Sequence, residues 1–109
     1  MQPLIAVVTT VATREQAQAL ADALVELRLA ACAQVSAIDS VYRWQGVLQH
    51  EGEFRVVFKT TAARYAAIEA AIRERHAYAL PQICAVALDP VDASYAAWVE
   101  AQCGTAPPG

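Results

Sequence analysis

The chain has 109 residues and a mass of 11.7 kDa, the size of a single domain. Its net charge is −3, and its eight lysines and arginines are scattered along the sequence. A nucleic-acid-binding protein or a basic membrane-binding helix is therefore not expected. Hydrophobic residues make up 57% of the chain, a high fraction for a small domain, and this favours self-association.

The first expected elements are a strand and an amphipathic helix. Residues 4–10 form a short apolar run rich in β-branched side chains, which is typical of a buried strand. Thr13 with Gln16 three residues later forms a capping box, which predicts the start of a helix. Leucines then recur four and three residues apart on one face, so we expect the helix to continue to about Leu29.

The N-terminal apolar run is not expected to direct export or to cross a membrane. No lysine or arginine precedes it and threonines soon interrupt it, so we expect a cytoplasmic protein. The three cysteines form no C-x-x-C pair and predict no disulfide framework. Cys32 and Cys84 lie in apolar segments and are predicted to be buried, whereas Cys103, beside the polar C-terminus, is predicted to be exposed.

A long β-hairpin is expected next. Residues 35–44 and 47–58 are rich in β-branched and aromatic side chains, with a turn at Gln45-Gly46 or near residues 50–52. The candidates for the sheet face that the helices leave uncovered are Tyr42, Trp44, Val56 and Phe58.

The next segment reads as a helix followed by a loop. Thr60 or Thr61 is predicted to cap a helix over residues 62–75. A loop is expected over residues 76–81, because Pro81 lacks an amide donor and disfavours helix before it.

The chain is expected to end with a strand and a short helix. Residues 83–88 are continuously apolar, which predicts a strand covered on both faces or lying near a subunit contact. Asp92 or Ser94 is predicted to open a C-terminal helix. We expect one domain over residues 1–103 and a disordered tail over residues 104–109.

The order β-α-β-β-α-β followed by a helix predicts an α+β, ferredoxin-like fold with both helices on one face of an antiparallel sheet. The other face would then meet water, at a cost of about 25 cal/mol per Å² of apolar surface. We therefore expect other copies of the chain to bury that face.

Several separated motifs resemble the CutA divalent-cation tolerance family over about residues 4–101. They are residues 29–33, 42–46, 59–60 and 76–81, and Tyr95 with Trp98. The resemblance implies a homotrimer similar to PII-type signalling proteins, with a role in tolerance of divalent cations, notably copper.

The chain departs from the family pattern mainly at charged positions. Ala79 and Gln82 stand where the family's loop carries glutamates, and Val47 replaces a basic residue. Thr9 stands where some members have a cysteine. The chain thus keeps the family's aromatic positions better than its charged ones.

His76 is the candidate metal ligand, because a neutral imidazole binds Cu²⁺ or zinc well. Its sequence neighbours supply no second ligand, and His50 belongs to the hairpin. Three interpretations stay open: a metal site within one chain, a site shared between subunits, and a histidine that only makes hydrogen bonds at an interface.

The remaining candidate residues are aromatic and charged. Glu51 and Glu53 lie on one face of a strand, as a carboxylate pair or as a solvated edge. Aromatic residues are predicted to line a cleft between subunits or to serve as packing anchors. Together with Lys59, which would supply a positive charge for an anion, the cleft set is Tyr42, Trp44, Lys59, His76, Tyr78 and Trp98.

The sequence does not predict an enzyme. It contains no nucleophile–base motif or glycine-rich phosphate loop, and it has no asparagine. The leading hypothesis is a trimeric metal-ion-binding or scaffolding protein of the CutA type. The alternatives are a PII-like protein that binds a small anion or nucleotide between subunits, and an interaction module for a partner protein.

Overall fold

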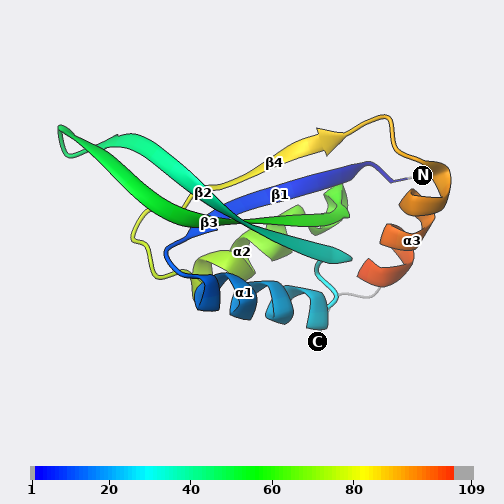
Figure 1. The fold of residues 1–109 in the computed structure, drawn as a ribbon. Helices are drawn as coiled ribbons and strands as arrows, with labels where there is room; N and C mark the ends of the chain where they lie inside the picture. The colour runs from blue at the N-terminus through cyan, green and yellow to red at the C-terminus, as the bar shows by residue number, and fades with distance from the viewer. Residues whose placement is uncertain (1, 105–109) are drawn as a thin grey trace.

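The computed structural model describes residues 2–104 (Figure 1). The element order confirms the predicted β-α-β-β-α-β pattern with a terminal helix. Apart from Gly104, the predicted tail lies outside the described residues. In chain order the elements are β1 (Leu4–Val11), α1 (Arg14–Glu26), β2 (Cys32–Trp44), β3 (Val47–Thr61), a short 3-10 helix η1 (Ala62–Arg64), α2 (Tyr65–Arg75), β4 (Ile83–Leu88) and α3 (Ala93–Cys103).

The four strands form one antiparallel sheet in the order β2-β3-β1-β4. β3 lies between β1 and β2, and β1 lies between β3 and β4, which is the split βαβ arrangement. Helices α1 and α2 lie on one face, and α3 lies at the end of the sheet near the N-terminus (Figure 1). The ferredoxin-like prediction is confirmed. We call the sheet face opposite α1 and α2 the open face.

The core lies between the sheet and helices α1 and α2. Val56 and Phe58 belong to this core and are both 0% exposed, so their predicted place on the open face was wrong. The register explains the error, because Phe58 pairs with the buried Val7 and shares its face. The alternate residues Val57 and Lys59 therefore point to the open face.

Helix α1 begins as predicted and ends earlier than predicted. The Thr13 hydroxyl accepts a hydrogen bond from the Gln16 amide, and the Gln16 side chain completes the capping box. The helix ends at Glu26, because Arg28 adopts a left-handed φ of 61°. The Arg28 guanidinium donates to two carbonyl oxygens in the last turn of α3, at 2.9 and 2.8 Å, and thereby docks that helix.

The two later helices differ in their caps. Thr61 occupies the N-cap position of the second helical segment, which starts as η1, but its side chain makes no capping bond. The Thr60 hydroxyl instead donates to the Leu29 carbonyl oxygen at 2.7 Å. The predicted cap position is therefore right for Thr61, and the predicted side-chain bond is absent. Asp92 does cap α3, because its carboxylate accepts from the Tyr95 amide.

The predicted cysteine environments were largely reversed. Cys103 is buried, packed with Leu4 and Ala96 where α3 meets the sheet. Cys84 is exposed on edge strand β4, and Cys32 is half-buried. An apolar neighbourhood in sequence does not bury a residue on an edge strand with no layer above it. All three thiols are free.

The hairpin of β2 and β3 projects beyond the rest of the sheet (Figure 1). Its turn is the two-residue Gln45-Gly46, the first of the two predicted positions, since Trp44 pairs directly with Val47. Both turn residues have positive φ, 50° and 81°, as a tight hairpin turn requires. No helix within residues 2–104 is both long and apolar enough to cross a membrane.

Replacing Thr9 with valine is expected to raise the free energy of unfolding by about 1 kcal/mol, because its fully buried hydroxyl finds no hydrogen-bond partner among the described residues. Thr60→Val is the matched control and should lower it by about 1–3 kcal/mol, since the Leu29 carbonyl loses its donor. Urea denaturation monitored by circular dichroism measures both. If both variants lowered the free energy of unfolding equally, the Thr9 hydroxyl would not be the unpaired group of the two.

Candidate functional site

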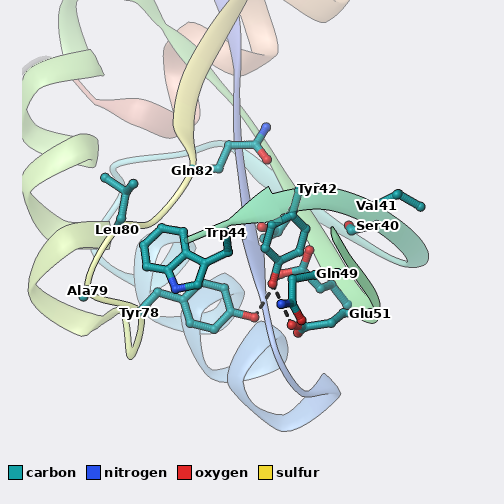
Figure 2. A pocket seen from close by; sticks show the side chains of 12 residues that line it. Ser40, Val41, Tyr42, Trp44, Gln49, Glu51, Tyr78, Ala79, Leu80 and Gln82 are labelled. Atoms are coloured by element: carbon teal, nitrogen blue, oxygen red, sulfur yellow. Dashed lines mark hydrogen bonds between the residues drawn. The ribbon is translucent and has the colours of Figure 1, made fainter. Parts of the chain in front are cut away.

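A pocket of about 680 Å³ lies where the hairpin meets the loop that follows α2. β1 contributes Thr10 to it, and the remaining side chains come from β2, β3 and the loop (Figure 2). Its lining combines aromatic rings with carboxylates, and those on which the chemistry depends are Tyr42, Trp44, Tyr78, Glu51 and Glu53.

Each tyrosine of the pocket donates to one glutamate. The Tyr42 hydroxyl lies 2.6 Å from Glu51 Oε1 (Figure 2), and the Tyr78 hydroxyl lies 2.9 Å from Glu53 Oε2. The short Tyr42–Glu51 contact is typical of a bond to an ionised acceptor. The first bond follows from strand register, because Tyr42 pairs with Gln49 and Glu51 is the next residue on the same face.

The two carboxylates differ in exposure. Glu53 is 7% exposed, whereas Glu51 is exposed to solvent, so the solvated-edge interpretation holds only for Glu51. Within the described chain, no lysine, arginine or histidine nitrogen lies within 4.0 Å of the Glu51 or Glu53 carboxylate oxygens. The ion pair of this part of the chain joins Arg75 to Glu74. The pocket therefore holds two acidic groups without an ion-pair partner from residues 2–104.

The pocket raises the pKa of both tyrosines. The hydrogen bond to Glu51 is the main cause that raises the pKa of Tyr42 to about 12, with burial second. Burial is the main cause that raises the pKa of Tyr78 to about 12, followed by its hydrogen bond to Glu53. Both phenols therefore stay protonated at neutral pH and keep donating to the carboxylates.

Glu51→Gln is expected to move one tyrosine titration from about 12 toward the usual 10, because the variant removes the main cause of the raised pKa of Tyr42. Glu53→Gln should move the pKa of Tyr78 less, since burial persists. Ultraviolet absorbance titration of phenolate measures both, with Glu26→Gln as an exposed control.

The same shifts give a pH dependence of stability. The folded state favours the neutral phenols, so their stabilisation is complete below pH 10 and is lost as pH rises from 10 to about 12. If Glu51→Gln left the phenolate titration curve unchanged, the hydrogen bond from Tyr42 to Glu51 would not be the cause of the raised pKa of Tyr42.

His76 contacts two residues of the pocket, Thr10 and Tyr78, and both of its ring nitrogens make hydrogen bonds. Nε2 lies 2.7 Å from the Thr10 carbonyl oxygen, which can only accept, so Nε2 carries the proton. Nδ1 accepts from the Tyr78 backbone amide at 3.0 Å, and the two rings lie 4.8 Å apart. His76 thereby positions Tyr78, and a metal at either nitrogen would replace one of these bonds.

The donor set of one chain does not fit a metal site. Within the part of the chain that the structure describes, no three side chains of the histidine, cysteine, aspartate and glutamate types come together to hold an ion. His76 as a ligand stays a prediction, and it would need donors from another copy.

Lys59 and Trp98 lie far from this pocket within a single chain. Lys59 pairs with Cys32 at the start of β2 and donates to the Gln34 side-chain oxygen at 2.9 Å. Trp98 stacks on Tyr95, with ring centroids 5.8 Å apart, and the Tyr95 hydroxyl lies 3.6 Å from Cys32 Sγ. Tyr42 lies ten residues after Cys32 along β2, which places it roughly 33 Å from Cys32.

The six predicted cleft residues therefore form two groups in one chain. Tyr42, Trp44 and Tyr78 line the pocket, and His76 is bonded to the Tyr78 backbone amide. Lys59 and Trp98 lie instead near the start of β2. The sequence analysis missed the pocket's tyrosine–glutamate bonds. The position of the hairpin turn could have predicted the Tyr42–Glu51 bond, because it sets the strand register that brings Glu51 beside Tyr42.

Comparison with known proteins identifies the relatives of this chain. The family model described as CutA1 divalent ion tolerance protein matches residues 5–102. The chain belongs to the CutA family. The divalent-cation tolerance protein CutA of Thermus thermophilus is 34% identical over 99 residues, covering 90% of this chain and 96% of the relative. The chloroplastic protein CutA of Arabidopsis thaliana is 31% identical, covering 90% and 54%.

Solved structures agree with this assignment. The structure of CutA from Synechococcus elongatus superposes with a TM-score of 0.91 at 36% identity, covering 95% of this chain and 93% of that one. In the present CutA protein, Ala79 and Gln82 both line the pocket. Neither side chain is charged, so the pocket's negative charge comes from the hairpin, at Glu51 and Glu53.

Proposed function

We propose that this CutA protein acts in the tolerance of divalent cations, with copper as the principal cation, as a cytoplasmic homotrimer. The observation that carries the proposal is the family match over residues 5–102, nearly the whole described chain. The role is one of binding or scaffolding rather than catalysis. The name of the Thermus relative refers to the same role.

Exposed apolar residues on the open face support the assembly. Val86, on edge strand β4, is 58% exposed in the single chain. β4 has one neighbour, β1, so its outer edge has no strand partner among the described residues. Burial of the part of this face around β4 against other copies would remove apolar surface from water at about 25 cal/mol per Å².

The metal contact, on this proposal, arises between copies. One chain offers His76, and no group of three metal-ligating side chains forms within the described residues. Ligands from a second chain would complete the coordination that Cu²⁺ or Zn²⁺ needs. Because His76 Nδ1 and Nε2 each make a hydrogen bond, coordination would exchange one of those bonds for the metal.

His76→Ala is expected to weaken copper(II) binding by at least about tenfold, since it removes the imidazole among the proposed ligands. Isothermal titration of copper(II) and zinc(II) into tag-free protein measures the effect. His50→Ala is the matched control, because His50 is an exposed hairpin histidine that does not line the pocket, and this variant should bind copper like the wild type. Equal affinities in the two variants, or no saturable binding, would remove direct metal binding at His76.

The PII-like alternative receives no comparable support. The pocket holds two carboxylates that would repel an anion. Lys59, the predicted anion partner, lies on β3 beside the start of β2, far from the pocket, and donates to the Gln34 side-chain oxygen. We therefore take forward the divalent-cation role alone.

A further inference from the structure

The electrostatics of the pocket point to a positively charged ligand. Glu53 is 7% exposed, and its described hydrogen bond comes from a neutral phenol, on Oε2. Neither Glu53 nor Glu51 has an ion-pair partner within residues 2–104. Buried carboxylates are normally paired with a cation, because water no longer solvates them. A cation entering this pocket would meet two carboxylates at once.

The walls of the pocket indicate what kind of cation fits. The lining includes the rings of Tyr42, Trp44 and Tyr78 and the apolar side chain of Leu80. Aromatic faces attract cations through the ring quadrupole, most strongly for tryptophan. A volume of about 680 Å³ lies within the range of small-molecule sites and far exceeds the space that a metal ion occupies.

The two tyrosine rings are held in place before any ligand arrives. The hydroxyls of Tyr42 and Tyr78 are tied to the two carboxylates, and Figure 2 shows the Tyr42 side chain turned toward Glu51. His76 holds the Tyr78 backbone amide, and Trp44 precedes the tight hairpin turn. Binding to a preorganised cage costs little side-chain entropy.

We propose that this pocket binds an organic cation, a quaternary or protonated amine with apolar substituents. The ammonium group lies against the aromatic rings, and Glu51 and Glu53 balance its charge. This ligand class differs from divalent metals, so the inference goes beyond the proposed function. It also needs only the pocket of one chain, whereas the metal contact requires His76 and a second copy.

Calorimetric titration of choline into the full chain tests the charge requirement. The matched probe is 3,3-dimethyl-1-butanol, which has the same shape with carbon in place of the charged nitrogen. Choline is expected to bind saturably, and the neutral analogue at least about tenfold more weakly. Equal affinity for both probes would overturn the proposal, and so would the absence of choline binding, which is the result expected if a neighbouring copy fills the pocket.

Variants then locate the bound cation. Trp44→Leu is expected to weaken choline binding about fivefold or more, whereas Trp44→Phe, which keeps an aromatic face, should stay within about threefold of wild type. Glu53→Gln keeps an acceptor for Tyr78 but removes the charge, and should weaken binding about tenfold, with Glu26→Gln unchanged. Equal affinities for the leucine and phenylalanine variants would overturn the aromatic contact.

A competition titration separates this inference from the proposed function. Copper(II) is expected to leave the affinity for choline unchanged. A loss of copper binding in His76→Ala would concern the proposed metal contact alone, because choline binding depends on Glu53. Displacement of choline by copper(II), together with loss of copper binding in Glu53→Gln, would show that the pocket is a metal site and overturn the organic-cation proposal.

Discussion

Replacing Phe58 with alanine is expected to lower the free energy of unfolding by about 3–5 kcal/mol. Phe58 is 0% exposed and is the largest fully buried side chain of the described chain. It lies on central strand β3 and packs in the core under α1 and α2. Because a domain of this size has about 5–15 kcal/mol in total, the variant should be close to unfolding.

Urea denaturation at one fixed protein concentration measures this loss, since association makes apparent stability concentration-dependent. Leu80→Ala is the control, because Leu80 is exposed in the loop after α2 and its loss should stay within about 0.5 kcal/mol. A loss below about 1 kcal/mol for Phe58→Ala would favour a place on the uncovered sheet face, as the sequence alone had suggested.

The elements could be predicted from local patterns, but the face of the central strand could not. Residues 56–58 are Val-Val-Phe, so every position is apolar and the period-2 signal that separates two faces is missing. The pairing of Phe58 with Val7 decides the face, and it depends on contacts between residues far apart in sequence. By contrast, the Thr13 capping box is a local signal and was predicted correctly.

The candidate site was predictable only in part, for the same physical reason. The aromatic residues near the turn stand out in the sequence, and Gln45-Gly46 is a recognisable turn. The His76 ring binds the Thr10 carbonyl, 66 positions away in the chain, and no local pattern announces such a bond. The burial of Glu53 likewise depends on the loop that brings Tyr78 over the sheet.

The burial of cysteines shows how the single chain and the assembly differ. Cys103 is buried because α3 packs against the end of the sheet, an interaction set by Arg28 reaching across 73 and 74 positions. Cys84, on the open face of β4, was expected to be buried, and it is exposed in the single chain. In the proposed trimer a neighbouring copy would cover this strand, so the apolar character of residues 83–88 fits the assembly better than the isolated chain.

Replacing Val86 with glutamate is expected to convert the proposed trimer into single folded chains. Val86 pairs with Ala6 and lies on the open face, 58% exposed, so the substitution removes little packing within one chain. In a trimer that buries this face, it would place one carboxylate per chain in an apolar contact, at a cost of several kcal/mol each. Light scattering should give about three times 11.7 kDa for the wild type and 11.7 kDa for the variant.

Val25→Glu is the matched control, because Val25 is also an exposed valine but lies on α1, which covers the opposite face of the sheet. It should keep the wild-type mass. Far-ultraviolet circular dichroism should show folded protein in both variants. A wild-type mass of 11.7 kDa, or a Val86→Glu variant that retains the full assembly, would place the contact elsewhere than the open face.

Since the proposed metal contact needs ligands from two copies, the single-chain Val86→Glu variant should also lose copper binding while retaining choline binding at Glu53 and Trp44.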